Sequence, residues 1–531
     1  MSNNVKNNNS SDVEEDGRIL ETQIFKPQDW NGVQYEGLQE PRLDTFLLVL
    51  KQVGITMGLC LAALNSGMMS VWPNSSMADL INTNTTIYGS YMALTPTQID
   101  MLGAMTSIGS MPGTWLGGVI VARLGRRRSV VLLLVPCVLG WGLVALAVNP
   151  TMLLAGRFVN GISCGLMLVA GATYCVELTD TKYRGAMALM PTIFLILGYI
   201  IIISLGLTLR WFQSPIVGIA IGVAGTIVMK FIPESPSYLS ITGREDQARR
   251  VLKSLRSPQA DIDAELYIIR NKNIAFQGES IFRVILQKDI AKSLCIVIPL
   301  FLIHNFCGIA ILLINSTRIF QSSGSILEEG VCSLLMFVCL LIGLCLSVFL
   351  QGRFGRRKCL LASLLGGGVC MGVFSTFQYC KQTTEVNVLN ETSVGDIITQ
   401  GTTLEMVTKN VSDDGNSTIN WIISANCEWT MEHTWVPLAC LLVFMLVTSI
   451  GILPVPYILA SEYFPTAVRA QMSSICVTLG SGFNMVALLL YTPMQTSLTP
   501  AGLYGFCSAV CFLGLIYSWV FVRETTGKHI G

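Results

Sequence analysis

The chain has 531 residues, of which 52% are hydrophobic and only 13% are charged, and its 34 basic and 33 acidic side chains leave a formal net charge of +1. A soluble globular chain carries about 25% charged residues, so this composition argues against one. The balanced charge excludes a strongly basic nucleic-acid-binding protein and a highly acidic disordered chain. Long, continuous apolar runs predict membrane-spanning helices, because a β-barrel would show alternating residues.

A run of about 20 apolar residues can cross a bilayer as a helix, and the sequence contains twelve such runs. They are residues 46–71, 99–122, 129–148, 151–176, 186–209, 214–232, 294–315, 331–350, 359–379, 436–459, 470–491 and 501–522. The expected fold class is an all-α polytopic membrane protein with twelve transmembrane helices. The expected domains are a tail (1–45), a six-helix half (46–232), a linker with short amphipathic helices (233–292), a second six-helix half (293–522) containing a long external loop (380–434), and a tail (523–531).

The distribution of charge predicts which side of the membrane each loop occupies. The first 45 residues are polar, so we expect no cleaved secretory signal and expect the first span to direct insertion. With both termini in the cytoplasm, the cytoplasmic segments, counted together with Lys51 and Lys230 near the cytoplasmic ends of their spans, hold 29 basic residues, and the external segments hold four. This is the bias that basic residues show in membrane proteins. Five glycosylation sequons fall in the external loops and agree with this topology: Asn74, Asn84, Asn390, Asn410 and Asn416.

Two short patterns recur in the two halves. Gly125-Arg126-Arg127 follows the second span, and Gly355-Arg356-Arg357 follows the eighth. A Glu–Arg pair with a spacing of seven follows the fourth and tenth spans, as Glu177/Arg184 and Glu462/Arg469. Basic turns alone would explain topology, but not the repeated spacing. The pattern therefore predicts two six-helix halves related as a parallel repeat.

These motifs, with Gly156-Arg157, Pro233-Glu234-Ser235-Pro236, Pro454-Val455-Pro456-Tyr457 and Glu524-Thr525, follow one another in an order that resembles the sugar porter family of the major facilitator superfamily. The resemblance extends over about residues 45–530. The stretches 233–239 and 65–80 are similar to insect facilitated trehalose transporters and their relatives. The resemblance implies the major facilitator fold and transport of a sugar by rocking of the two halves.

A cytoplasmic gate is the first site that the repeat and the resemblance predict. Arginine forms forked hydrogen bonds with carboxylates, and such pairs at helix ends can hold a gate and break when the halves move. The alternative is that these charges serve topology alone. The expected gate residues are Arg126, Arg127, Glu177, Arg184, Glu234, Arg356, Arg357, Glu462 and Arg469. The Asp that the family places before each Gly-Arg-Arg turn is replaced by Ala122 and Gly352, which would loosen this gate.

The second predicted site is a substrate cavity near the midplane, since polar side chains within spans tend to face the bundle interior. The candidates for binding substrate are His304, Asn305, Thr192, Tyr457, Asn315 and Asn484. For Asn484, a hydrogen bond between helices is an equally good interpretation. The resemblance implies that several family sugar contacts are lost, because Ala310 and Leu340 stand where it places asparagines.

No Asp or Glu lies deep in any span, so we predict facilitated (uniport) transport of a hexose or a disaccharide such as trehalose. His304 could in principle carry a proton, although a hydrogen-bonding role is favoured. The alternatives are a transporter of another small solute, or a sugar-sensing or non-transporting paralogue, which the short C-terminal tail disfavours. Neither a phosphate-binding loop nor a metal-spaced cluster occurs in the sequence, so an enzyme, a cofactor and a metal are not expected.

The expected partners are the sugar and the lipid bilayer, with no nucleic acid, and the expected location is the plasma membrane. Cys380 and Cys427 are the cysteines of the long external loop. Because that side is oxidising, they are a candidate disulfide, with two unpaired thiols as the alternative.

Overall fold

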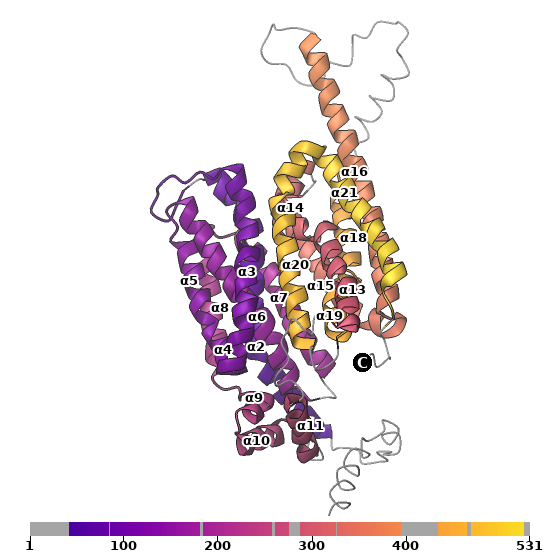
Figure 1. The fold of residues 1–531 in the computed structure, drawn as a ribbon. Helices are drawn as coiled ribbons and strands as arrows, with labels where there is room; N and C mark the ends of the chain where they lie inside the picture. The colour runs from indigo at the N-terminus through magenta and orange to yellow at the C-terminus, as the bar shows by residue number, and fades with distance from the viewer. Residues whose placement is uncertain are drawn as a thin grey trace, which may run out of the picture. The chain divides into compact units, whose positions relative to one another are not determined.

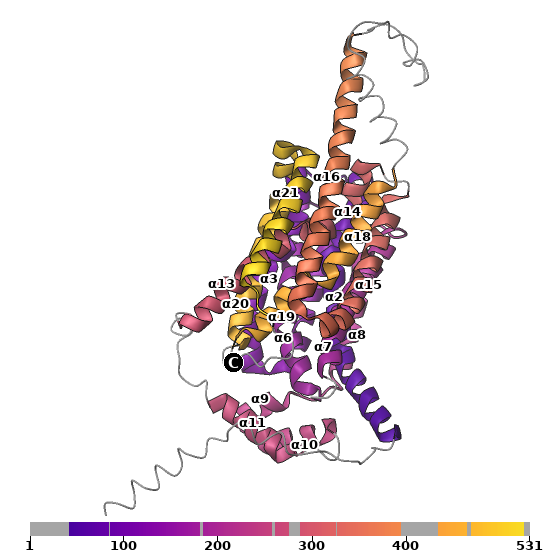
Figure 2. The same cartoon turned by 90° about the vertical axis from the view of Figure 1, so that its right-hand side faces the viewer.

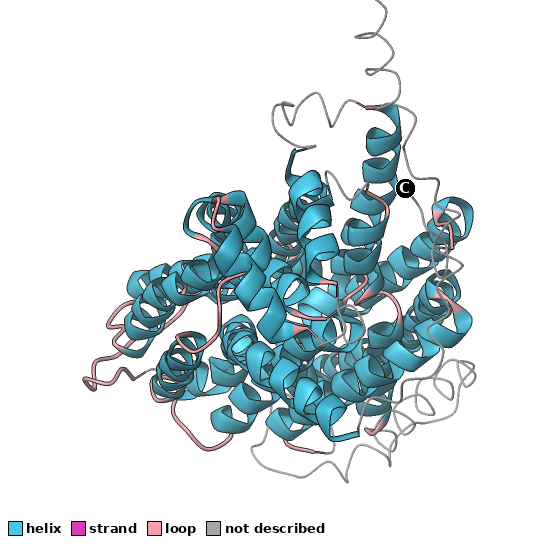
Figure 3. Cartoon of the chain, turned by 90° about the horizontal axis from the view of Figure 1, so that it is seen from below, coloured by secondary structure: helices cyan, strands magenta, loops and turns pink. Residues whose placement is uncertain are grey.

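The computed structural model describes residues 42–83, 85–180, 184–256, 261–274, 287–324, 327–394, 434–464 and 469–524. Within these ranges the chain consists of helices joined by short loops (Figure 3). Among the described residues, ten helices are long and apolar enough to cross a membrane, and one further apolar helix is shorter. The all-α polytopic fold expected from the sequence is confirmed. Residues 50–531 form one compact unit, and the contacts described below lie within it.

Each half contains six helical segments among the described residues, and Figures 1 and 2 colour them by their position along the chain. The first half contains α2 (Arg42–Thr83), α3 (Pro96–Leu124), α4 (Arg126–Leu132) with α5 (Leu134–Ala145), α6 (Pro150–Leu178), α7 (Arg184–Gly206) and α8 (Ser214–Met229). The second half contains α13 (Lys288–Phe306) with α14 (Ile309–Ser323), α15 (Glu329–Phe354), α16 (Arg356–Val394), α18 (Val436–Ile450) with α19 (Val455–Glu462), α20 (Arg469–Leu489) and α21 (Tyr491–Phe521).

In the described part of the linker, three short helices lie between the halves in sequence: α9 (Pro236–Ile241), α10 (Glu245–Leu255) and α11 (Ile262–Ile274). The amphipathic helix α10 buries Ala248, Leu252 and Leu255. Arg256 donates to the carbonyl of Leu178 at 3.0 Å and forms an ion pair with Glu265 at 2.8 Å. The linker is thus fastened to the cytoplasmic end of the first half.

Several predicted spans differ from the observed helices. The seventh span is two helices, α13 and α14, separated at Gly308, whose φ of 106° suits glycine. The tenth is also divided, between α18 and α19. Two helices extend beyond their predicted ends: α2 continues to Thr83, and α16 continues to Val394. The first residues of the predicted external loop (380–434) therefore continue a helix, and the bounds of that loop stay a prediction.

Prolines mark places where side chains of neighbouring helices donate hydrogen bonds to backbone carbonyls. A proline lacks the N–H that would bond the carbonyl four residues before it, and in lipid that carbonyl needs another donor. Side chains from other helices supply it at five places. The bonds run from Arg157 to Met69 (before Pro73), from Cys175 to Met187 (before Pro191), from Tyr517 to Cys295 (before Pro299), from Ser347 and Gln351 to Ile450 (before Pro454), and from His304 to Ile452 (before Pro456).

Within the first half, α3 and α6 pack so closely that their backbones touch. A Cβ atom added to Gly109 would lie 2.0 Å from the carbonyl oxygen of Phe158, and one added to Gly161 would lie 2.3 Å from that of Thr106. Small residues permit such close approach of membrane helices, which associate through packing rather than through hydrophobic burial.

We predict that Gly161→Ala lowers the stability of the protein, because the new methyl group forces α3 and α6 apart. The expected loss is about 1–3 kcal/mol, as for other overpacked sites, measured as a fall in the thermal unfolding midpoint in detergent. The matched control is Gly118→Ala on α3, where a Cβ meets no atom within 4 Å. Equal effects of the two substitutions would contradict the close contact.

Candidate functional site

The breaks in the seventh and tenth spans lie side by side and carry the central polar cluster. The imidazole Nδ1 of His304, near the end of α13, lies 3.1 Å from the carbonyl oxygen of Ile452, which the missing N–H of Pro456 leaves unpaired. Because a carbonyl only accepts, Nδ1 must carry the proton. In the neutral ring Nε2 is then an acceptor, and it has no partner among the described residues.

Two further predicted residues join His304. The amide of Asn305 donates to the carbonyls of Phe301 (2.8 Å) and Gly480 on α20 (3.2 Å). The ring of Tyr457 on α19 meets the His304 ring edge-on, with the centroids 5.9 Å apart. Tyr457 remains 44% exposed, so its ring offers a surface as well as a contact.

The other candidates have different surroundings. Asn484 lies one turn beyond Gly480 on α20, and its buried Oδ1 has no hydrogen-bond partner among the described residues. Asn315 is buried on α14, where its Oδ1 accepts from Arg318 at 3.4 Å. Thr192 is exposed on α7 and makes no hydrogen bond to the described part of the cluster. The structure therefore unites His304, Asn305 and Tyr457, and leaves Thr192 apart.

On the predicted outer side, a hydrogen-bonded contact joins the two halves. Asn74 on α2 donates to the hydroxyl of Ser316 at 2.6 Å and accepts from the backbone N–H of Thr317 at 3.0 Å. The Thr317 hydroxyl donates to the carbonyl of Asn74 at 3.2 Å. Asn74 is 1% exposed. In this conformation Asn74 lies inside a helix and its amide is occupied, and its glycosylation stays a prediction.

An ion pair lies next to this contact. Arg318 on α14 approaches Asp100 at the start of α3, with Nη1 and Oδ1 3.4 Å apart. The Asp100 side chain is buried, and the guanidinium of Arg318 also lies 5.5 Å above the ring of Tyr491. The sequence placed Arg318 in an external segment and Asp100 at the outer start of the second span, but it gave no sign that they meet, since pairing depends on how α3 and α14 face each other.

The cytoplasmic gate residues of the first half form one network. Arg126 and Glu177 make an ion pair at 3.0 Å. The carboxylate of Glu234 accepts from the backbone N–H groups of Arg126 (2.8 Å) and Arg127 (3.0 Å) at the start of α4. Those groups have no partners within the helix. Gly125, with φ of 90°, lets the chain turn into this position.

The second half repeats this network. Arg356 forms an ion pair with Glu462, and Glu524 accepts from the backbone N–H groups of Arg356 (3.0 Å) and Arg357 (3.1 Å) at the start of α16. Gly355 has φ of 89°, matching Gly125. Glu524 was missed as a gate residue, although its place after the twelfth span corresponds to that of Glu234 after the sixth.

The second arginine of each repeat also has a matching role. Arg127 donates to the carbonyl of Lys230 at 2.6 Å, and Arg357 donates to the carbonyl of Trp519. Both networks thus join the Gly-Arg-Arg turn to the cytoplasmic end of the last span of the same half and to the glutamate that follows it. Arg184 and Arg469 begin α7 and α20, and the positions of their side chains lie outside the described part.

The contacts between the halves define the conformation. Hydrogen bonds from Asn74 and the Asp100–Arg318 pair join the halves on the outer side, and Thr114 meets Thr478 at 3.0 Å farther in. On the cytoplasmic side, each gate network described above closes within its own half. The structure therefore corresponds to a state that is closed on the outer side.

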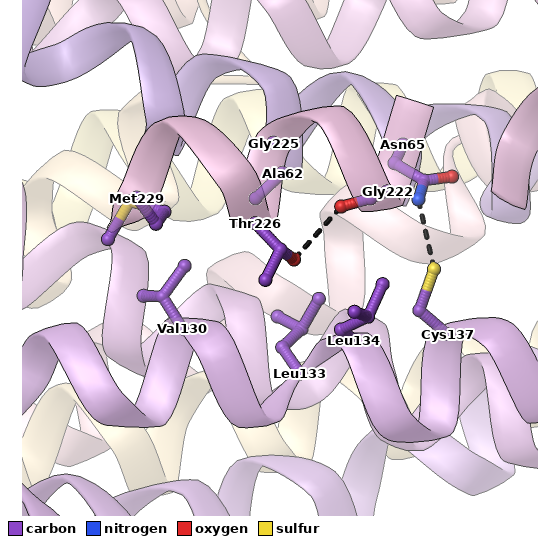
Figure 4. Close-up of a pocket in the computed structure, with 10 residues that line it drawn as sticks. All are labelled: Ala62, Asn65, Val130, Leu133, Leu134, Cys137, Gly222, Gly225, Thr226 and Met229. Carbon is purple, nitrogen blue, oxygen red and sulfur yellow. Dashed lines mark hydrogen bonds between the residues drawn. The ribbon is translucent and has the colours of Figure 1, made fainter. Parts of the chain in front are cut away.

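A small pocket inside the first half is separate from the central cluster (Figure 4). Asn65 and Cys137 lie on its wall, with their side-chain nitrogen and sulfur 3.0 Å apart. Its free volume of about 10 Å³ is room for at most one water molecule. The pocket is too small for a sugar.

Several predicted sites remain untested. Asn84, Asn410, Asn416 and Cys427 lie outside the described residues. Asn390 and Cys380 lie on α16, and the side chain of Asn390 is not described. The glycosylation of these asparagines and the Cys380–Cys427 disulfide stay predictions.

Comparison with known proteins places this geometry in a family. Residues 51–398 and 416–530 match the family model described as "Sugar (and other) transporter". The chain belongs to this sugar transporter family. The facilitated trehalose transporter Tret1 of Drosophila mojavensis is 26% identical over 500 residues, covering 92% of this chain and 52% of that protein. The Tret1 of Culex quinquefasciatus is 25% identical over 489 residues, covering 92% of this chain and 85% of that protein. The chain spans about half the length of the Drosophila relatives it matches.

Solved structures of the xylose transporter XylE from E. coli share the fold. One XylE structure, in a partially occluded inward open conformation, has a TM-score of 0.67 and 18% identity, and the match covers 90% of this chain and 99% of XylE. Another, a proton:xylose symporter structure bound to 6-bromo-6-deoxy-D-glucose, has a TM-score of 0.66 and 18% identity and covers 90% of this chain and 97% of XylE. The major facilitator fold predicted from the repeat is thereby confirmed.

We predict that Asp100→Arg weakens closure of the outer side, because it replaces attraction to Arg318 with repulsion. A cysteine introduced at Ile314 reports this opening, since the Ile314 side chain packs on Gly103 of α3. Its labelling by a membrane-impermeant maleimide is expected to quicken several-fold, equivalent to about 1 kcal/mol for a partly exposed pair. Adding Arg318→Asp restores the pair and the slow rate. If the exchanged pair labels as fast as Asp100→Arg, the ion pair does not hold this side.

Proposed function

We propose that this transporter moves a sugar, a hexose or a disaccharide such as trehalose, down its gradient across the plasma membrane by alternating access. One observation carries the proposal: the acceptor Nε2 of His304 and the exposed ring of Tyr457 stand together at the helix breaks of the second half. Family membership and the likeness to trehalose transporters support it.

The chemistry of the cluster suits a neutral, hydroxylated solute. A sugar hydroxyl can donate to His304 Nε2, and the unpartnered Oδ1 of Asn484 can accept a second one. The ring of Tyr457 can pack against the apolar face of a sugar ring. None of these three groups carries a fixed charge, so the cluster does not favour an anion or a cation.

The same cluster is joined to the inner gate by a short helix. Tyr457 and Glu462 both belong to α19, which has eight residues. His304 holds the carbonyl of Ile452, just before α19, and Glu462 pairs with Arg356 beyond it. A solute that binds His304 or Tyr457 therefore contacts residues attached to α19, the helix that carries the gate carboxylate of Glu462. We propose that this helix transmits occupancy of the site to the cytoplasmic gate.

The proposal of uniport rests on the acidic residues near the path. In the described spanning helices, Asp100 is at an outer end and is paired with Arg318, while Glu177 and Glu462 are at cytoplasmic ends and are paired with Arg126 and Arg356. A proton-driven transporter commonly uses a titratable group buried along its path. His304 is a further candidate, but its Nδ1 is engaged by a carbonyl.

We predict that His304→Asn separates the two roles of the histidine. The asparagine amide keeps a donor near the position of Nδ1 for the Ile452 carbonyl but removes the acceptor Nε2. The KM for the transported sugar should rise roughly 5- to 30-fold, the effect of one lost buried hydrogen bond, with little change in thermal stability. His304→Leu removes both bonds and should also lower stability. Unaltered sugar uptake by both variants in liposomes would place the site elsewhere.

We predict that uptake in proteoliposomes reaches the external sugar concentration and does not exceed it. An imposed proton gradient should leave this end point unchanged, because no group on the path couples a proton to the solute. The control is exchange of labelled for unlabelled sugar, which shows that the protein is active. Accumulation driven by an inward proton gradient would reject uniport and favour a proton role for His304. Exchange of no sugar at all would favour another solute or a non-transporting paralogue.

A further inference from the structure

Arg157 on α6 is a fully buried cation that none of the roles above explains. It is 0% exposed. Its Nη1 donates to the carbonyl of Met69 on α2, its Nε donates to the carbonyl of Leu102 on α3 at 3.2 Å, and its guanidinium lies 5.6 Å above the ring of Trp72. Its Nη2 has no hydrogen-bond partner, and no carboxylate pairs with it among the described residues. Placing such a charge in a membrane protein is costly, so its function should depend on these contacts.

The Met69 carbonyl is the one that Pro73 leaves without a helical donor. Pro73 lies inside α2, four residues after Met69. The carbonyl of Met69 thus accepts its hydrogen bond from a side chain of α6, outside α2. At the other four proline sites the donors are the neutral groups of Cys175, Tyr517, Ser347 with Gln351, and His304. At Pro73 the donor is a guanidinium, whose fork also reaches a second helix, α3.

The residue after Pro73 makes the outer contact between the halves. Asn74 bonds Ser316 and Thr317 through both its side chain and its carbonyl. These bonds form only when the helical turn at Pro73 holds Asn74 in one orientation. The ring of Trp72, which faces the guanidinium of Arg157, also donates a hydrogen bond from Nε1 to the hydroxyl of Ser214 at 3.1 Å. The turn of residues 72–74 is therefore fixed on the side of the first half by α6 and α8, and presents Asn74 to α14.

We propose that Arg157 is a positioning residue for the outer gate. By bonding the carbonyl that Pro73 leaves unpaired, it fixes the turn that presents Asn74 to Ser316 and Thr317, and so sets how firmly the outer side closes. This inference rests on the proposed alternating access, but it concerns a different step from sugar recognition. The charge contributes through its two backbone carbonyls and not through a carboxylate partner.

The test pairs Arg157→Met with Pro73→Ala. Alanine at 73 restores the backbone N–H that can bond the Met69 carbonyl within α2, so it removes the need for Arg157. In Arg157→Met the cysteine reporter at Ile314 should label about tenfold faster from outside, as expected for the loss of a hydrogen bond from a charged group. Adding Pro73→Ala should return the rate most of the way to that of the parent. A double variant that labels as fast as Arg157→Met would overturn the proposal.

Two further variants keep the outcome interpretable. Asn74→Ala removes the side-chain bonds of this contact, which Pro73→Ala cannot restore; rescue there would also reject the proposed order of contacts. If Arg157→Met does not fold, Arg157→Lys keeps the charge but supplies a point donor in place of the fork. Its labelling should be faster than the parent rate and should be slowed by Pro73→Ala; an unchanged rate would reject the proposal. Labelling needs no sugar, so a protein that transports none still tests Arg157, whereas the uptake assay alone tests the proposed function.

Discussion

The requirement that every backbone carbonyl in the bilayer find a donor organises this molecule. Prolines at 73, 191, 299, 454 and 456 each remove one helical donor, and side chains from neighbouring helices replace it. In lipid an unpaired carbonyl is costly, so each replacement fixes which helices are neighbours and how they face each other. The same prolines that interrupt helices therefore hold the bundle together.

This constraint also explains why the candidate substrate cluster lies where it does. The break between α18 and α19 brings the Ile452 carbonyl to His304, and the bond fixes the imidazole tautomer so that Nε2 is an acceptor. The α19 helix then carries Tyr457 at one end and Glu462 at the other. The bond from His304 to Ile452, the proposed binding residue Tyr457 and the gate carboxylate of Glu462 thus meet at one short helix. We propose that binding of the solute affects the cytoplasmic gate through this helix.

Different physical contacts occur on the two sides of the membrane. On the cytoplasmic side, carboxylates accept from unpaired N–H groups at helix starts, a repeated arrangement that stabilises each half by itself. On the outer side, Asn74 and the Asp100–Arg318 pair join one half to the other. Partly exposed pairs of this kind contribute only about 1 kcal/mol, which suits a contact that must break in every transport cycle.

Apolar run length and the placement of basic residues were enough to predict the all-α fold, because lipid allows few alternatives to a helix and topology follows charge. The repeated motifs, with the resemblance to the sugar porter family, predicted most residues of the two charged networks but missed Glu524. The same resemblance suggested His304, Asn305 and Tyr457 as one candidate site. The sequence did not reveal that Asn74 is a buried contact between the halves, that Asp100 meets Arg318, or that Arg157 bonds the carbonyl that Pro73 leaves unpaired. Those facts depend on which faces of separate helices meet, and residues far apart in the chain carry no local pattern that specifies such pairing. Only the packed bundle decides it.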